Sequence, residues 1–459
     1  METKDRQPPH AVNLRFGVFF DGTGNNRDNA VKTGGGEIDD SASFDISAVT
    51  PALHGSYGSA PTNVALLYEL YREEIGEPGR DLFLKTYIEG IGTTSGGDDS
   101  RYVQATGRWR GGIRHRVAQA VATVCEQVVR AAFAQPARRI ASIRFDLFGF
   151  SRGAAAARHF ANELRTGPQS GLAKALQGHP GLFVSEFSWS ADLDIAFIGL
   201  FDTVAAVVSP LAGNFSPGNE RFAGLRLGLG ADVAGKVVQL VAADEHRANF
   251  ALVRTDNDIR LPGAHSDIGG GYLPRMRERV MLCKPCSNRV SRSTPIEKTA
   301  AYASVAARLA SMKGDPTVRI ETWEKCVRGD RRKGEAPEKQ VFAAIVRERE
   351  VFGHLSRIYL RIMYEMARQQ NVPLMALGEE REQLRLPQEL KEVCRKLREH
   401  AMGRRGDQGL DAAELAMLSA RYVHTSAHWN PPLDQGNTAL DVFYVNRPAA
   451  GGRVCLDNV

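Results

Sequence analysis

Ser151 is the residue whose surroundings in the sequence best suit covalent chemistry. It is the centre of a Gly-x-Ser-x-Gly pattern at 149–153, which follows an apolar run that begins at Ile143 and precedes four alanines. A strand that ends in this pattern and turns at once into a helix forms a nucleophile elbow, which exposes the serine hydroxyl at the carboxyl edge of a parallel sheet. We therefore expect Ser151 to be a nucleophile, with the amide of Arg152 facing a developing oxyanion.

A serine nucleophile needs a base to remove its proton and an acid to orient that base. In α/β-hydrolases these groups follow in the order serine, acid, histidine, each after a strand. Asp202 ends the apolar run 193–201, and His265 follows the strand-like segment 250–260 in a glycine-rich loop. Asp202 could instead cap a helix, and His265 could be an ordinary loop histidine, but we favour acid and base. His424 is the second candidate base.

The loop after the first predicted strand is a second region of interest. Residues 21–24 read Asp-Gly-Thr-Gly. The amides of Gly22 and Thr23 are candidates for an oxyanion hole together with that of Arg152. Because the chain has neither Gly-x-Gly-x-x-Gly nor Gly-Lys-Ser/Thr here, a nucleotide site is not expected, and neither is a nucleic-acid partner.

A metal site is the alternative chemistry for the same residues. Asp21 and Asp267 could hold a divalent cation together with His265, since carboxylate oxygens and imidazole nitrogens are metal ligands. This would make the protein a metal-dependent hydrolase. We rank it below the serine mechanism and expect no cofactor.

Strands and helices alternate around these residues. The predicted strands are 14–20, 81–88, 143–150, 193–202 and 250–260. The predicted helices begin at 63, 113, 152 and 237. This alternation predicts an α/β fold, with a mostly parallel, α/β-hydrolase-like sheet flanked by helices, over residues 12–273.

The chain changes in character after residue 273. We expect residues 274–459 to form a helical, basic region that packs on the core. The expected elements are helices at 298–312, 341–370, 379–402 and 411–421, charged loops at 275–297 and 325–340, and a strand at 439–445 that returns to the core.

Composition limits the class of protein. A chain of 459 residues that is 43% hydrophobic can bury one large core or two smaller ones. Six cysteines are too few for a disulfide framework, and Cys283 and Cys286 are interpreted as two free thiols. No apolar run reaches the roughly 18 residues of a transmembrane helix, and the first 20 residues lack the apolar core of a secretory signal. We expect a soluble protein made in the cytoplasm.

Positive charge is concentrated in one part of the chain. Residues 271–340 hold 16 Lys and Arg against 8 Asp and Glu, while the whole chain carries only +6. A basic block of this kind is usually a solvated surface. The more specific alternative is attraction to an anionic partner such as phospholipid headgroups.

Seven motifs in order resemble the catalytic domain of the first family of type VI secretion lipase effectors (Tle1-like), which are antibacterial phospholipases. They lie at 19–26, 62–64, 90–93, 149–153, 199–204, 244–247 and 262–272. The resemblance covers about residues 14–273, and 421–426 is also family-like. Phe201 stands where the family often has Trp.

The resemblance implies an α/β-hydrolase fold and a serine hydrolase of phospholipase A type, with Ser151, Asp202 and His265 as its triad. It also implies a membrane phospholipid substrate in the periplasm of a rival cell, delivery by a type VI apparatus, a spike or adaptor partner and a cognate immunity protein. Residues 275–420 would contact membrane or adaptor. The rivals are an esterase acting on another acyl ester, the metal-dependent hydrolase, and a non-catalytic membrane-binding protein.

Overall fold

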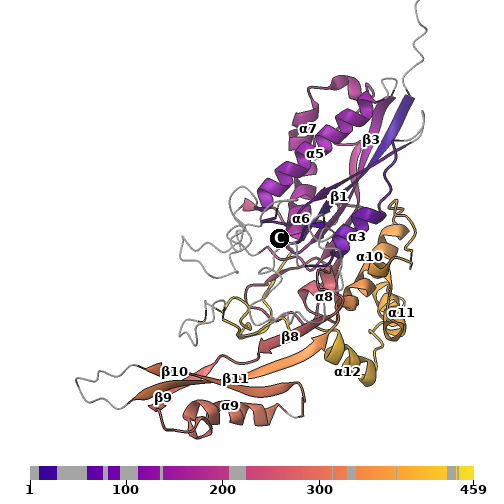
Figure 1. The fold of residues 1–459 in the computed structure, drawn as a ribbon. Helices are drawn as coiled ribbons and strands as arrows, with labels where there is room; N and C mark the ends of the chain where they lie inside the picture. The colour runs from indigo at the N-terminus through magenta and orange to yellow at the C-terminus, as the bar shows by residue number, and fades with distance from the viewer. Residues whose placement is uncertain are drawn as a thin grey trace, which may run out of the picture.

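A six-stranded parallel sheet forms the centre of the molecule (Figure 1). The computed structural model describes residues 10–27, 59–75, 81–93, 112–134, 138–205, 224–312, 314–327, 337–378, 380–431, 441 and 444–458. The strands lie in the order β2-β1-β3-β4-β5-β7. Their bounds are β1 His10–Phe20, β2 Leu82–Ile88, β3 Arg138–Phe150, β4 Leu193–Phe201, β5 Lys236–Ala242 and β7 Asp258–Leu261. The predicted α/β class is confirmed.

The register of the sheet brings the carboxyl ends of its central strands together. Phe20 of β1 lies opposite Gly149 of β3, and Phe150 lies opposite Phe201 of β4. Phe201 in turn lies opposite Leu240 of β5. The loops that follow these strands therefore emerge side by side at one edge of the sheet.

Helices cover both faces of the sheet. One face carries α5 Ile113–Phe133, α6 Arg152–Leu164 and α7 Gly171–Leu176, and the other carries α3 Asn63–Leu70 and α10 Ser356–Gln369 (Figure 1). Strand side chains alternate between the faces. Phe145 packs with Phe160 of α6, whereas Phe148 stacks on Phe19 in the second core, where α3 and α10 lie.

The prediction for the segment after residue 273 was partly wrong. Residues 276–351, which we call the arm, form an antiparallel sheet that projects from the core (Figure 1). Its elements are β8 Met276–Met281, β9 Cys286–Ser291, α9 Ala300–Ser311, β10 Val318–Val327 and β11 Glu338–Val351. The predicted loops 275–297 and 325–340 contain strands, because these segments pair in a sheet around β11 that packs on an apolar cluster including Val305 and Ile345.

Two predicted helices are also strands, in whole or in part. The segment 237–248 begins as β5, where its β-branched residues are buried between β4 and β7. The segment 341–370 begins inside β11 and becomes helical only at Ser356. Tertiary packing overrides helical spacing at both places.

The remaining helices lie near their predicted positions. They are α11 Lys391–Ala401 and α12 Ala412–Arg421. The short α8 His265–Gly269, which follows β7, lies in the segment predicted as a glycine-rich loop. The predicted strand 439–445 falls mostly outside the described residues. A different segment returns to the core, because β12 Cys455–Leu456 pairs with β6 Leu252–Val253. No helix in the described part of the chain has both the length and the apolar character that a bilayer crossing requires.

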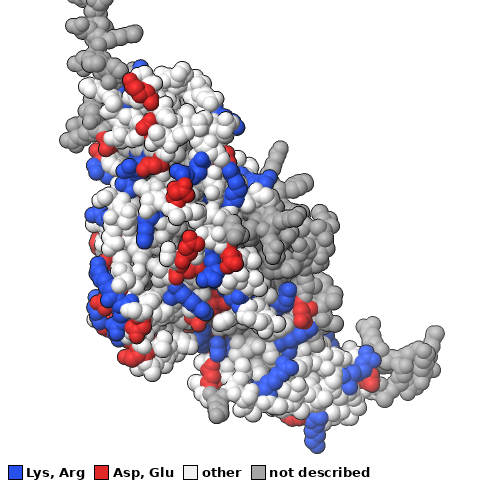
Figure 2. All heavy atoms as spheres, turned by 180° about the vertical axis from the view of Figure 1, so that it is seen from behind, with Lys and Arg blue, Asp and Glu red and all other residues white. Residues whose placement is uncertain are grey.

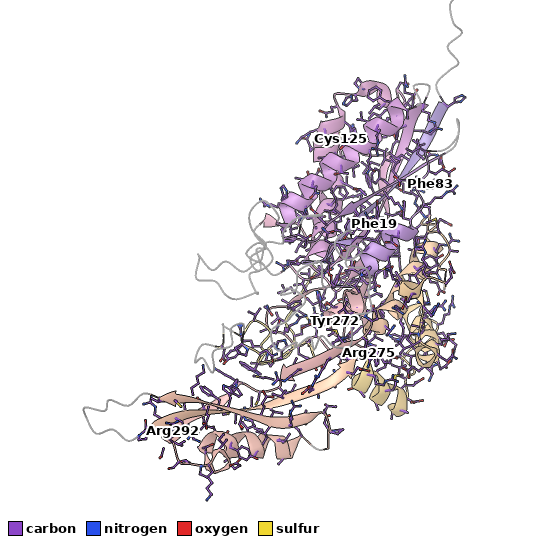
Figure 3. All side chains as sticks on the ribbon, in the orientation of Figure 1. Phe19, Phe83, Cys125, Tyr272, Arg275 and Arg292 are labelled. Atoms are coloured by element: carbon purple, nitrogen blue, oxygen red, sulfur yellow. The ribbon has the colours of Figure 1, made fainter. Side chains whose placement is uncertain are left out.

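Acidic side chains offset much of the positive charge of the arm. Arg275 Nη2 lies 2.7 Å from a Glu350 carboxylate oxygen, and Lys339 Nζ lies 2.9 Å from that of Glu324. Arg277 and Arg319 both bind Glu348. Basic and acidic groups are interspersed on the face in Figure 2, and Arg275 lies near the base of the arm while Arg292 lies far out on it (Figure 3).

Two of these acidic partners lie outside the basic segment 271–340, so a count over that segment alone does not include their negative charge. Glu348 and Glu350 lie beyond residue 340, on the part of β11 that pairs with β8. The ion pairs thus join parts of the chain that are far apart in sequence.

Gly153 sets how closely α6 approaches the sheet. A Cβ atom at this position would lie 2.3 Å from the backbone oxygens of Phe20 and Asp21. We predict that Gly153→Ala lowers the free energy of unfolding in urea by about 2–3 kcal/mol, because backbone atoms must move to admit the methyl group. Gly181→Ala is the matched control, since a Cβ there meets nothing within 4 Å. Equal stability of both variants would contradict the prediction.

Candidate active site

Ser151 occupies a strained turn between β3 and α6. Its φ is 57° and its ψ is −125°, a conformation that non-glycine residues rarely adopt. The backbone holds it there, since the Ser151 amide donates to the Phe201 carbonyl at 3.0 Å. Serine at a helix N-cap ordinarily accepts a backbone hydrogen bond, yet this hydroxyl makes no capping bond. The side chain is therefore not used to stabilise the helix.

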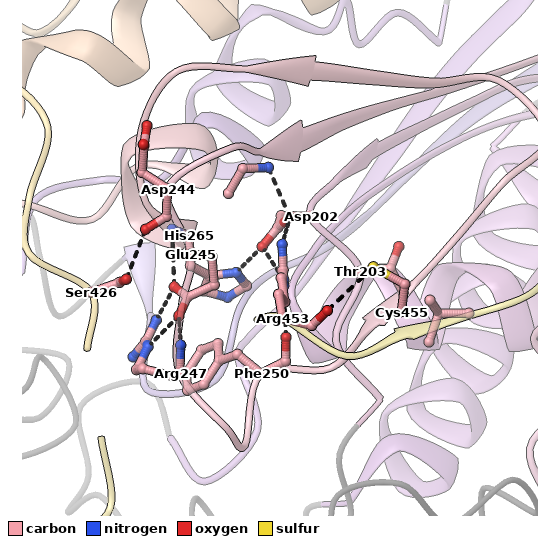
Figure 4. Close-up of polar contacts among 12 residues, drawn as sticks. Asp202, Thr203, Asp244, Glu245, Arg247, Phe250, His265, Ser426, Arg453 and Cys455 are labelled. Atoms are coloured by element: carbon pink, nitrogen blue, oxygen red, sulfur yellow. Dashed lines mark hydrogen bonds and ion pairs between the residues drawn. The ribbon is translucent and has the colours of Figure 1, made fainter. Parts of the chain in front are cut away.

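His265 and Asp202 form a buried acid–base pair at the same edge of the sheet. His265 Nδ1 lies 2.5 Å from Asp202 Oδ2, and the two residues are 4% and 0% exposed (Figure 4). Asp202 also has a positive φ, 46°, and its amide donates to the Leu240 carbonyl at 2.8 Å. No helix begins at residues 203–205, which the structure describes directly after Asp202. The carboxylate therefore faces His265 and does not cap a helix.

Arg453 binds the same carboxylate from the opposite side. Its Nη1 and Nη2 donate to Asp202 Oδ1 and Oδ2 at 2.8 and 2.7 Å (Figure 4). The Ala242 amide donates to Oδ1 at 3.0 Å. Burial alone would raise the pKa of Asp202, but Arg453 and His265 outweigh burial and hold the pKa below its ordinary value.

A second ion pair supports the histidine. Glu245 is buried and binds Arg247 through both of its oxygens, at 2.9 and 2.8 Å, and the His265 amide donates to it at 3.3 Å. The Arg247 guanidinium lies 3.3 Å from the centre of the Phe250 ring, whose edge packs against the His265 ring. Burial lowers the pKa of His265 in spite of Asp202, so the imidazole is neutral at pH 7.

Phe150 links the serine to the histidine. Its ring centre lies 4.7 Å from that of His265. A Cβ at Gly269 would lie 2.1 Å from the same ring, so the close approach of α8 depends on that glycine. No hydrogen bond joins the Ser151 hydroxyl to a described side chain, and such bonds often tighten only when substrate binds.

His424 lies in a separate pair. Its Nδ1 is 2.6 Å from Asp267 Oδ1, and its amide donates to Asp267 Oδ2 at 3.0 Å. Its ring stacks on Tyr272 at 3.7 Å between centres. Asp267 also accepts the Ala264 amide at the start of α8. The structure thus places His265, and not His424, against Asp202, while His424 anchors the helix that carries His265.

The loop after β1 is held by Asp21. Asp21 Oδ1 accepts the Gly22 amide at 2.6 Å and the Thr62 hydroxyl at 2.8 Å, and Oδ2 accepts the Tyr87 hydroxyl at 2.5 Å. Burial raises the pKa of Asp21 to about 6. The Gly22 amide is therefore occupied by Asp21. Of the two amides predicted for the oxyanion hole, only that of Thr23 has no acceptor among the described groups.

The residues of the metal alternative are committed to different partners. Asp21 binds Thr62 and Tyr87, whereas Asp267 binds His424. In the described part of the chain, no group of three His, Cys, Asp or Glu side chains could hold a metal ion. The geometry thus gives the metal alternative no support.

Arg453 is a site residue that the sequence does not predict. It lies 251 residues from Asp202 and belongs to no recognisable motif. Glu245 and Arg247 lie in the motif at 244–247, and an acid and a base two residues apart before the histidine loop are the sequence signal for their ion pair.

Comparison with known proteins identifies the family and the fold of the chain. The family model of the type VI secretion phospholipase effector Tle1-like catalytic domain matches residues 15–177 and 182–292. The structure of a Tle1 effector bound to the VgrG spike is similar to the chain, with a TM-score of 0.76 and 28% identity over 98% of this chain and 95% of that one. An uncharacterised protein from Pseudomonas aeruginosa aligns at 19% identity over 86% of this chain and 51% of that one, with a TM-score of 0.38. No curated protein matches.

The His265–Asp202 pair and the His424–Asp267 pair lead to different predictions for the reactivity of Ser151. We expect His265→Gln to slow labelling of Ser151 by a fluorophosphonate by about 10³-fold or more, because the base is lost. His424→Gln should slow labelling by less than about tenfold but lower the free energy of unfolding by about 2–4 kcal/mol, since the buried Asp267 loses the imidazole bound to its Oδ1. The reverse ranking of labelling rates would identify His424 as the base.

The pH dependence follows from the burial of His265. A base acts only when neutral, and burial lowers the pKa of His265 below its ordinary value of 6.5. Labelling of the wild-type serine should therefore persist below pH 6.5, with the midpoint of the acidic limb under that value. A midpoint at or above pH 7 would contradict this assignment.

Proposed function

The chain belongs to the Tle1-like family of type VI secretion phospholipase effectors, and we propose that it hydrolyses acyl esters of membrane glycerophospholipids with a Ser151–His265–Asp202 triad. The observation that supports the triad best is the buried 2.5 Å contact between His265 and Asp202. At the same edge of the sheet, Ser151 occupies a strained elbow and its hydroxyl makes no capping hydrogen bond.

The first half of the reaction forms an acyl-enzyme. His265 Nε2 accepts the proton of Ser151 as its Oγ attacks the acyl carbonyl carbon, and the carbonyl π-electron pair moves to oxygen. Asp202 stabilises the imidazolium and fixes its tautomer through Nδ1. When the tetrahedral intermediate collapses, the ester C–O bond breaks and His265 returns the proton to the lysophospholipid oxygen.

The second half releases the fatty acid. Water gives a proton to His265 and attacks the acyl-enzyme carbonyl, and Ser151 leaves with the proton from His265. In both halves the negative oxygen needs preorganised donors. We assign these to the amides of Arg152, at the first turn of α6, and Thr23, neither of which donates to a described group.

Secretion and partners are further parts of the proposal. The similar solved structure is that of an effector bound to a VgrG spike, and it aligns over nearly the whole of both chains. We propose that this chain likewise binds a spike protein and is delivered with it into the periplasm of a rival bacterium, where phospholipid is its substrate. A toxin of this kind also requires an immunity protein in the cell that makes it.

The charge pattern of the arm bears on the non-catalytic alternative. Arg277 and Lys339 of the arm have carboxylate partners. The exposed Arg292, Lys298 and Lys325 have no ion pair with a described acidic group, so the arm keeps positive charge that attracts an anionic surface. The arm is therefore compatible with membrane contact, and the hydrolase proposal rests on the sheet edge.

We predict that Ser151→Ala abolishes release of fatty acid from phospholipid vesicles, by on the order of 10⁴-fold or more, without change in fold. Vesicles carrying distinguishable acyl chains at the two glycerol positions, analysed by mass spectrometry, report both the rate and the ester that is cleaved. Circular dichroism and urea unfolding check that the variant is folded.

Ser142→Ala is the matched control, because Ser142 lies on the same strand away from the elbow and binds Asn13. It should retain wild-type activity. A soluble short-chain ester tested in parallel separates a phospholipase from a general esterase, which would hydrolyse the soluble ester alone. Fatty acid release by Ser151→Ala at the wild-type rate would overturn the triad.

A further inference from the structure

All three nitrogens of the Arg453 guanidinium donate hydrogen bonds at or beside the proposed acid, Asp202. Two nitrogens donate to the two oxygens of Asp202, and Nε donates to the Phe250 carbonyl at 2.8 Å. The side chain is only 8% exposed. A bidentate guanidinium fixes the plane of a carboxylate as well as its charge, so this contact determines which way Asp202 presents an oxygen to His265.

The segment that carries Arg453 is fastened on both sides. Before it, the Ala248 amide donates to the Arg447 carbonyl at 3.0 Å, and the Ala449 amide donates to that of His246 at 2.9 Å. After it, β12 pairs with β6, and the Asn458 side chain exchanges hydrogen bonds with the backbone of Leu229 at 2.8 and 2.9 Å. Backbone pairing on both sides of Arg453 therefore fixes where its side chain begins, close to Asp202.

The alternative supports for the carboxylate are few. Besides His265 and Arg453, the only described donor to Asp202 is the Ala242 amide, which binds Oδ1 alone. Oδ2 receives His265 and Arg453 and nothing else among the described groups. Without the guanidinium, a fully buried anion would depend on one amide and the imidazole, and these two contacts alone would hold its plane.

We propose, on the basis of the hydrolase function above, that Arg453 is a positioning residue of the triad, which locks Asp202 in the plane that receives His265 Nδ1–H and offsets its charge. The offset has a chemical purpose. A fully negative Asp202 would hold the proton on His265 too firmly, whereas a paired Asp202 leaves the imidazole neutral and ready to accept the serine proton.

The charged groups around His265 define what the test must separate. Asp202 binds it from the position after β4, and Arg453 of the segment 447–458 binds the same Asp202 oxygen. Glu245 and Arg247 act on it from the loop after β5. Asp267, on the same helix α8, is occupied by His424. Removing the charge of Arg453 alone leaves the other pairs intact, so the proton affinity of His265 should rise.

The test compares three variants on a soluble ester across pH. Arg453→Met should lower kcat by about ten- to a hundredfold with little change in KM, and move the acidic limb of kcat/KM up by about one pH unit. Arg453→Lys keeps the charge but loses the fork, so kcat should fall about tenfold while the limb stays in place. Arg254→Met is the matched control, since Arg254 lies next to β6, pairs with Asp258 and is 54% exposed; it should behave as wild type.

A second measurement does not depend on turnover. Nitrogen-15 NMR of labelled histidine, with His265 assigned through His265→Gln, should show the His265 titration moving to higher pH in Arg453→Met and unchanged in Arg254→Met. An unmoved His265 titration in folded Arg453→Met overturns the proposal. If that variant does not fold, wild-type kcat in Arg453→Lys overturns it instead. Absence of hydrolysis of both the soluble ester and phospholipid vesicles by the wild type would refute the proposed function, while the NMR comparison would still decide the role of Arg453.

Discussion

The burial of one carboxylate, that of Asp202, is the constraint on which the site depends. A fully buried anion is costly unless opposite charge and hydrogen bonds compensate it, and here the compensation comes from His265, Arg453 and the Ala242 amide. These three groups belong to α8, the segment 447–458 and β5. Elements from distant parts of the chain therefore meet around Asp202 at one edge of the sheet, where the proposed triad lies.

Small residues and one aromatic ring set the distances at that edge. Gly153 admits α6 against the backbone of β1, and Gly269 admits α8 against the ring of Phe150. The same ring lies on His265, so the residue before Ser151 also supports the proposed base. The Glu245–Arg247 pair performs the corresponding task on the other side of the imidazole. Positioning in this site thus comes largely from packing and ion pairs outside the triad.

The sequence predicted what is local and missed what is distant. The Gly-x-Ser-x-Gly turn, the helix 113–133 and the carboxyl-end positions of Asp202 and His265 follow from neighbouring residues, and the structure has them. The arm was interpreted as loops and helix because its charged strands gain their stability from partners across the sheet, such as Arg275 with Glu350. Arg453 could not be found for the same reason: nothing beside it in sequence shows what it binds.

The separation between Asp202 and Arg453 bears on when the site matures as the chain is made. Residues are added to a growing protein in order, and contacts between distant segments form late because long loops must close first. A nascent chain can contain Ser151, Asp202 and His265 while still lacking the cation that neutralises the acid. Full assembly of the charge network therefore waits until Arg453 has been added, so a ribosome-bound intermediate can carry Ser151, Asp202 and His265 without the guanidinium that binds Asp202.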